Sequence, residues 1–149
     1  FSNRQAAADM TRALIDKGYR NIAFVGEADD DWTRGAARRK GYLDAMEEAG
    51  LPTDRALKIG KPPLSIEEGA AAATRLLEDF PDTDCVFCVS DAPAFGVLSV
   101  MLKLGKAVPH DIGIAGFGDF EVSRFATPTI STVSLVPVPF NLTVRDITK

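Results

Sequence analysis

Residues 85–96 read CVFCVSDAPAFG, and residues 108–119 read VPHDIGIAGFGD. In each stretch a short apolar run is followed at once by small and polar residues. The first run, Cys85–Val89, leads through Ser90 and Asp91 into a helix-forming segment. Strands that are apolar throughout belong to buried parallel sheets, and the carboxyl ends of such strands form a ligand crevice at one edge. The pattern favours recognition of a small molecule.

Helical and extended segments alternate along the rest of the chain. Helices are expected over about residues 3–17, 32–49, 66–79 and 92–104, and strands over 22–25, 56–59, 85–89 and 112–115, with a last short strand at 130–133. Ser65 and Glu68 have the spacing of a capping box, which starts the third helix. Strands separated by helices indicate parallel βαβ units. The predicted fold class is therefore α/β, a parallel sheet flanked by helices.

Composition limits the possible functions. The chain has 149 residues, 46% of them hydrophobic, which suits one globular domain with its own core. The net charge is -4, and the only tight basic cluster, residues 38–40, points in several directions on a helix, which argues against a DNA-binding face. No apolar run approaches the roughly 20 residues of a membrane span. The first residue is Phe and no secretory leader is visible, so we expect a piece of a longer cytoplasmic protein that does not contact a membrane.

Neither a metal centre nor a catalytic centre is predicted. Cys85 and Cys88 form a CxxC, but their spacing within a strand puts them on opposite faces, so buried structural thiols are favoured over a redox or zinc site. The acidic run at residues 29–31 is interpreted as a solvated loop rather than a metal site. His110 is expected in an exposed loop, and no nucleophile has an obvious base partner. We expect no cofactor and no catalytic residue.

Four loops meet at the predicted carboxyl edge of the sheet, at residues 27–34, 61–65, 90–91 and 116–119. They combine carboxylates, guanidiniums, hydroxyls and aromatic rings, the mixture that a sugar requires, since charged groups bind its hydroxyls and a ring covers its apolar face. The candidates are Asp29, Asp30, Asp31, Asp91, Asp119, Arg34, Arg38, Ser65, Ser90, Trp32 and Phe117.

Three of these candidates have structural alternatives that the sequence leaves open. Asp91 is explained equally well as the N-cap of a helix and as a ligand contact, and it can be both. Trp32 fits either packing under a loop or lining a pocket. Arg38 lies one turn into its helix, where a surface salt bridge is the alternative to contact with a ligand.

Several motifs follow one another in a family-specific order. They are GYRNIAF at 18–24, RRKGY at 38–42, FCVSDAPAFG at 87–96, LGKAVPHDI at 104–112, GFGD at 116–119 and PTISTV at 128–133. Together they closely resemble the lactose/galactose repressor (LacI/GalR) family of bacterial transcription regulators, most of all its gluconate-repressor branch. The resemblance implies one lobe of a periplasmic-binding-protein-like (type I) fold. It assigns residues 1–133 to the C-terminal lobe of an effector-binding domain and leaves 134–149 as an atypical tail, where Pro137 and Pro139 disfavour regular structure.

The function implied by this resemblance is effector sensing. A sugar or sugar acid would bind between two lobes and change operator binding by a helix-turn-helix outside this chain. The protein would be a homodimer and not an enzyme, and a lone lobe would bind its effector weakly. A periplasmic sugar-binding protein of an ABC transporter is the alternative.

The resemblance also assigns roles to residues. Arg38 takes the place of the ligand-gripping arginine, three positions before Gly41, and Gly118 stands where the family usually has Asp, which favours an acidic ligand. The implied ligand-binding residues are Trp32, Arg34, Arg38, Leu64, Ser90, Asp91, Phe117 and Asp119. The implied dimer-interface residues are Ala94, Val97, Leu98, Met101, Val122 and Phe125.

Overall fold

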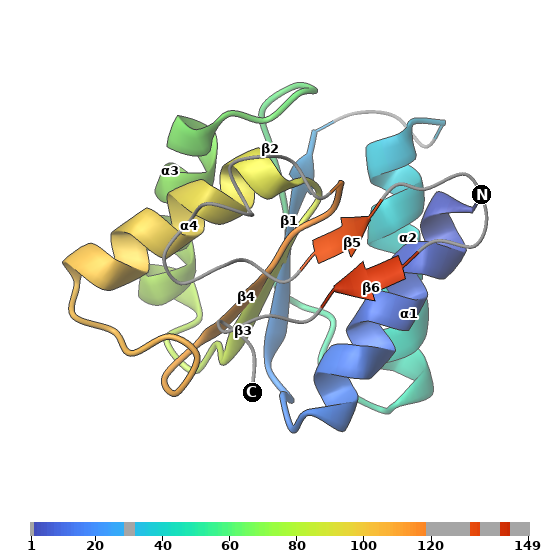
Figure 1. The fold of residues 1–149 in the computed structure, drawn as a ribbon, viewed down its shortest axis with the longest axis horizontal. Helices are drawn as coiled ribbons and strands as arrows, with labels where there is room; N and C mark the ends of the chain where they lie inside the picture. The colour runs from blue at the N-terminus through green and yellow to red at the C-terminus, as the bar shows by residue number, and fades with distance from the viewer. Residues whose placement is uncertain (1, 29–31, 119–131, 135–140, 144–149) are drawn as a thin grey trace.

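The computed structural model describes residues 2–28, 32–118, 132–134 and 141–143. Helices and strands alternate along these ranges (Figure 1). The helices are α1 (Asn3–Asp16), α2 (Arg34–Glu48), α3 (Ile66–Asp79) and α4 (Asp91–Lys103), and the strands are β1 (Ile22–Glu27), β2 (Ala56–Ile59), β3 (Cys85–Cys88), β4 (Gly113–Ala115), β5 (Thr132–Ser134) and β6 (Asn141–Thr143). Every main element expected from the sequence is present within a few residues of its predicted bounds.

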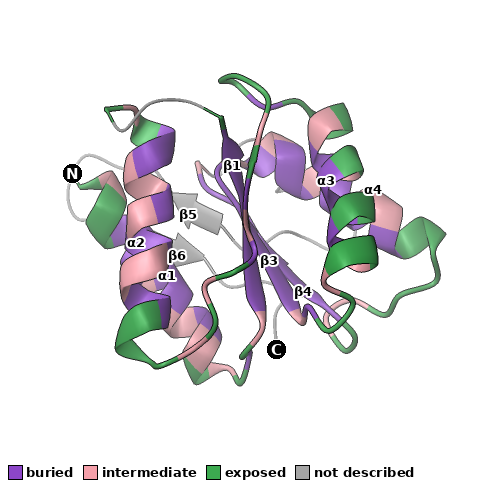
Figure 2. Ribbon diagram, turned by 180° about the vertical axis from the view of Figure 1, so that it is seen from behind, coloured by how far each residue is buried: buried purple, intermediate pink, exposed green. Residues whose placement is uncertain are grey.

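Four of the strands form one parallel sheet in the order β2-β1-β3-β4. Helices α1 and α2 cover one face of this sheet, and α3 and α4 cover the other (Figures 1 and 2). All residues of β1, β3 and β4 are buried, as an apolar strand between two helical layers must be. The predicted α/β architecture is confirmed. Strands β5 and β6 form a separate antiparallel pair, so the tail contributes a strand that the prolines did not lead us to expect.

Aromatic side chains fill the centre of the layer between the sheet and α2. The Phe24 ring stacks on Tyr42, with 5.4 Å between centroids, and meets the edge of Phe87 at 5.5 Å. The Tyr42 hydroxyl donates to the carbonyl of Ile22, which satisfies the one polar atom of a fully buried ring. Cys85 and Cys88 are buried free thiols in β3, and burial raises the pKa of Cys88, so the structural interpretation of this pair is the one that fits.

Local signals set where the helices begin. Ser65 Oγ accepts from the Glu68 amide while Glu68 Oε1 accepts from the Ser65 amide, both at 3.0 Å, which confirms the predicted capping box. Helix α2 begins at Arg34, two residues later than predicted, because Thr33 caps it and accepts from the Ala36 amide at 3.0 Å. Among the residues described, no helix is long and apolar enough to cross a membrane.

The prediction that one face of α4 is exposed for dimer contact is wrong. Ala94, Val97, Leu98 and Met101 were expected to be exposed for dimer contact, but all four are buried in the core of the chain itself. Helix α4 is apolar on several sides, so its period does not distinguish the face toward the sheet from the face toward solvent. The other two expected interface residues, Val122 and Phe125, lie outside the described residues.

Glycine lets the two helices of one layer approach closely. A Cβ atom added at Gly41 in α2 would lie 2.1 Å from the Arg4 carbonyl oxygen and 2.9 Å from the Ala8 amide nitrogen of α1. Both neighbours are backbone atoms of a helix, so they cannot move aside singly. The α1–α2 contact therefore requires glycine at position 41.

The substitution Gly41→Ala tests this packing. Helix propensity alone predicts that alanine stabilises an interior helical position by up to about 1 kcal/mol. The backbone clash instead predicts a loss of about 1–3 kcal/mol in the free energy of unfolding, measured by urea denaturation. Ala71→Gly, at an exposed position of α3, serves as a control that reports propensity alone. A Gly41→Ala variant as stable as the parent would contradict the packing argument.

Candidate functional site

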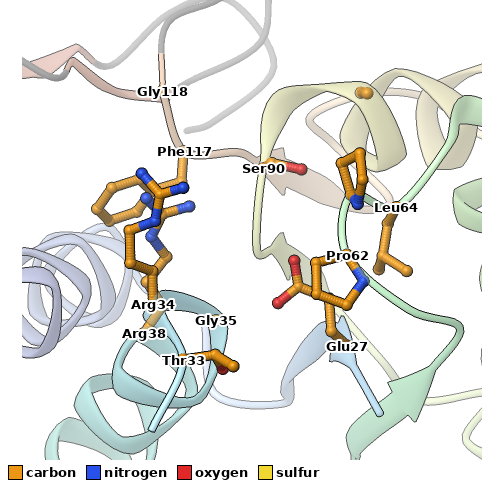
Figure 3. Close-up of a pocket in the computed structure, with 12 residues that line it drawn as sticks. Glu27, Thr33, Arg34, Gly35, Arg38, Pro62, Leu64, Ser90, Phe117 and Gly118 are labelled. Carbon is orange, nitrogen blue, oxygen red and sulfur yellow. The ribbon is translucent and has the colours of Figure 1, made fainter. Parts of the chain in front are cut away.

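A cavity of about 640 Å³ opens at the carboxyl edge of the parallel sheet. Loops after all four strands contribute to its wall, as the sequence predicted for this edge. The lining residues are Glu27, Thr33, Arg34, Gly35, Arg38, Pro62, Pro63, Leu64, Ser90, Ala92, Phe117 and Gly118 (Figure 3).

The structure brings five of the predicted ligand residues to this cavity: Arg34, Arg38, Leu64, Ser90 and Phe117. Two others are placed elsewhere. Trp32 is 91% exposed and is not part of the lining, and Asp91 is fully buried behind the wall. The candidates Asp119 and Asp29–Asp31 lie outside the described residues, and Ser65 serves as the N-cap of α3.

Three contacts hold the Arg38 side chain at the cavity. Its Nε donates to Asn3 Oδ1 at 3.0 Å, and its Nη1 donates to the carbonyl of Val89 at 2.9 Å. The guanidinium carbon lies 3.9 Å from the centroid of the Phe117 ring, a cation–π contact. A guanidinium has five N–H donors, and these bonds use two of them. Arg38 is thus fixed in position while retaining donors for a ligand.

The charges around Arg38 include both signs. Burial and, after it, the positive charge of Arg34 lower the pKa of the Arg38 guanidinium, and the carboxylates of Glu27 and Asp91 oppose the shift, with a net result of about 10. Because a pKa of about 10 is still well above neutral pH, Arg38 remains a cation there. The surface salt bridge offered as the alternative for Arg38 is not formed within the described part of the chain.

The buried carboxylate of Asp91 lies next to this site. Asp91 Oδ1 lies against Gly116, where an added Cβ would be 2.1 Å from that oxygen. Asp91 is the first residue of α4 and Ser90 is its N-cap, so the predicted N-cap role of Asp91 is wrong by one position. Its carboxylate still stands in the first helical turn, where the helix dipole favours negative charge.

Glu27 is a lining residue that the sequence did not single out. It closes β1 and is only 8% exposed, and its carboxylate lies against Gly35, where an added Cβ would be 1.6 Å from Oε2. The sequence placed Glu27 at the start of an acidic loop, because an apolar strand was expected to end at Val25. The sequence signal that could have identified Glu27 is its position at the end of β1, with Gly35 eight residues later leaving room for its carboxylate.

Ser90 and Gly118 complete the cavity wall from the far strands. Ser90 occupies the N-cap of α4, but its side chain makes no capping hydrogen bond, and it lines the cavity. Gly118 has φ +114°, a conformation that L side chains rarely adopt. The backbone therefore gives a reason for glycine at position 118 besides the charge of a ligand.

Within the described ranges no group of three His, Cys, Asp or Glu side chains could hold a metal ion. His110 is exposed in the turn before β4 and does not line the cavity. What the lining offers is an oriented cation, hydroxyls, an aromatic ring and apolar surface, which is a binding site for a small polar molecule.

Known proteins share this fold. A family described as "Periplasmic binding protein-like domain" matches residues 11–139. The HTH-type transcriptional regulator GntR of Escherichia coli K12 is 34% identical over 134 residues, which are 89% of this chain and 39% of that protein. The crystal structure of a LacI family transcriptional regulator from Silicibacter pomeroyi is 51% identical with a TM-score of 0.96, covering 100% of this chain and 63% of that chain. A complex of the transcriptional regulator CelR with cellobiose is 26% identical with a TM-score of 0.87, covering 99% of this chain and 52% of that chain.

The parallel sheet carries a polar cavity at its carboxyl edge, and its fold matches these proteins. It is therefore a ligand-binding α/β domain of the periplasmic-binding-protein type. The chain belongs to the periplasmic binding protein-like domain family, among the LacI/GalR-type transcriptional regulators. The resemblance seen in the sequence is confirmed. The chain spans about two fifths of the length of the curated relatives it matches, between 36% and 39% for several of them.

The coupling free energy between Arg38 and Phe117 can be measured. We expect a double-mutant cycle of Arg38→Met and Phe117→Leu to yield a coupling of about 0.5–2 kcal/mol in the free energy of unfolding, because the cation lies over the ring and is partly desolvated. Urea denaturation of the parent, both single variants and the double variant measures it. Phe80→Leu is the control, since Phe80 faces Arg55 instead, and its cycle with Arg38→Met should be additive. Additivity in both cycles would contradict the contact.

Proposed function

We propose that this chain is the C-terminal lobe, residues 1–133, of the effector-binding domain of a LacI-type transcriptional regulator. A sugar or sugar acid would bind in a cleft of which the described cavity forms one half. The observation that carries the proposal is Arg38, held by Asn3, Val89 and Phe117 so that its remaining donors serve a ligand at the cavity. The cellobiose bound to the similar regulator CelR supports a sugar-like effector.

The proposed mechanism is a population shift. An effector that contacts this lobe and a second lobe stabilises one orientation of the two, and the affinity for operator DNA changes with it. The relatives are named HTH-type regulators and extend well beyond the matched region, so we assign DNA binding to a helix-turn-helix outside this chain. A single lobe supplies half of the contacts and is expected to bind the effector weakly.

We assign the protein no catalytic activity and place it in the cytoplasm, where a regulator meets its operator. Relatives that are transcriptional regulators support both assignments. They also favour a regulator over the alternative of a periplasmic sugar-binding protein of an ABC transporter. An exported binding protein would respond to sugar without any effect on DNA, so the operator measurement below separates the two.

The role of Arg38 is tested by Arg38→Lys in the full-length protein. Lysine keeps the charge but lacks the fork that binds paired hydroxyl or carboxylate oxygens, so effector affinity should fall by about tenfold or more while operator binding without effector is retained. Calorimetric titration with sugars and sugar acids, and gel shifts with operator DNA, measure the two quantities. Arg75→Lys on the exposed face of α3 is the matched control. Unchanged effector affinity in Arg38→Lys would overturn the assigned site.

We further infer a homodimer, supported by apolar side chains left at the surface near the end of α4. Leu102 is 45% exposed and Leu104 is 60% exposed, while the residues first expected at the interface are buried. Contiguous exposed apolar side chains favour association. We assign the interface to these residues in place of Ala94, Val97, Leu98 and Met101, which are buried.

Leu102→Glu tests this inference. A charge at a buried apolar contact is costly, so the variant should sediment as a monomer at concentrations where the parent is a dimer. Glu47→Lys, an exposed charge change on α2 across the sheet, is the control and should leave the dimer intact. A monomeric parent protein, or a Leu102→Glu dimer of undiminished affinity, would contradict the α4 interface.

A further inference from the structure

We propose that Asn3 is a positioning residue of the effector site, because its side-chain oxygen fixes the direction of the Arg38 guanidinium and ties that direction to the first turn of α1. The inference rests on the proposed function above, since it concerns the arginine that would hold the effector. Asn3 is not among the residues that line the cavity, so it acts through Arg38.

The contacts of Arg38 with Phe117 and Val89 leave its guanidinium free to turn. The guanidinium carbon lies 3.9 Å from the centroid of the Phe117 ring, and Figure 3 shows the two groups against each other. This contact sets the distance to the ring but gives no direction to the N–H groups. The bond from Nη1 to the Val89 carbonyl, at 2.9 Å, fixes one point, about which the guanidinium can still pivot.

Asn3 supplies the second fixed point. The Nε of Arg38 donates to Asn3 Oδ1 at 3.0 Å. Because the guanidinium is planar and rigid, bonds from two of its nitrogens to two different elements determine where its remaining N–H groups point. Nε carries one hydrogen, so the donors left for a ligand are on Nη1 and Nη2. In the described part of the chain Asn3 is the one side chain that accepts a hydrogen bond from Arg38.

The start of α1 does not itself require asparagine at position 3. Asn3 is the first residue of the helix, and the N-cap is Ser2, whose Oγ accepts from the Gln5 amide at 3.1 Å. The Ser2 carbonyl accepts from the Ala6 amide at 3.0 Å, which closes the first turn. Asparagine is also a poorer helix former than alanine. The contact with Arg38 therefore explains this side chain better than the helix does.

Other contacts hold α1 on α2 without Asn3. The Arg4 carbonyl lies against Gly41, and the Arg4 guanidinium donates two hydrogen bonds to the Asp44 carboxylate, at 2.6 and 2.9 Å. Loss of the Asn3 side chain therefore leaves the helix packing in place and releases only the direction of the guanidinium. By reciprocal coupling, an effector that immobilises Arg38 also immobilises Asn3 and the first turn of α1.

The first test is Asn3→Ala in the full-length protein, titrated by calorimetry with D-gluconate, D-glucose, D-galactose and cellobiose. For a probe that the parent binds, affinity should fall about tenfold, because a guanidinium that can pivot must be ordered on binding. In an Arg38→Lys background the same substitution should change the affinity by less than about twofold, since lysine has no rigid fork to orient. A residue that merely supports the fold would have equal effects in both backgrounds.

The second test is hydrogen exchange of the same proteins with and without saturating probe. In the parent, the probe should slow exchange at the Gln5 and Ala6 amides, which report the first turn of α1, by about threefold or more. In Asn3→Ala the probe should have no such effect, although it still occupies the site.

Asp44→Asn is the matched control, because it removes an α1–α2 contact that does not involve Arg38. It should leave probe affinity within about twofold and the protection of the first turn intact. The inference is overturned, and the proposed function stands, if Asn3→Ala acts equally in both backgrounds, if Asp44→Asn weakens the probe as much, or if the protection persists in Asn3→Ala. If no probe binds the parent, the proposed function fails and the inference fails with it.

Discussion

The hydrogen bonds and ring contact of one guanidinium join the parts of this site that are most distant in sequence. Arg38 on α2 donates to Asn3 of α1 and to the carbonyl of Val89 just beyond β3, and it lies over Phe117 beyond β4. These partners span the chain from residue 3 to residue 117. Because the guanidinium is planar and rigid, all three can be satisfied only when α1, α2 and the carboxyl edge of the sheet are in their native places. The cavity therefore depends on the complete βαβ framework, and its geometry is a property of the fold rather than of one loop.

The parallel sheet and its helices were predictable because they follow from local and periodic signals. Fully apolar strands at β1, β3 and β4, and the capping box at Ser65, each specify their element without help from distant residues. The buried face of α4 was not predictable in this way, since apolar residues surround that helix. Gly69 and Gly96 decide it: Cβ atoms there would meet backbone atoms of the facing helix at 2.1 and 1.9 Å, which fixes how α3 and α4 pack. The packing of α3 on α4 thus depends on two glycines in different helices, and the hydrophobic period of one helix does not reveal it.

The candidate site was predictable at the level of which strand ends take part. Parallel strands bring their carboxyl ends together by necessity, so Arg38, Ser90 and Phe117 could be assigned to one cavity from their positions alone. Which side chains turn toward the cavity depends on distances of a few ångströms. Asp91 lies behind the wall because Gly116 leaves room for its carboxylate, and Glu27 lies in the wall because Gly35 does the same. In both cases a glycine on another segment decides where a carboxylate goes.

These two glycines also explain how the site holds its charges. Each one admits a buried carboxylate next to the first turn of a helix, Glu27 at α2 and Asp91 at α4, where positive helix ends favour it. The same two carboxylates favour the charged form of Arg38, which burial would otherwise disfavour. The positive charge of Arg38 is thereby stabilised by carboxylates of the fold itself. Arg34, which lines the same cavity, acts against this balance, since its positive charge lowers the pKa of Arg38.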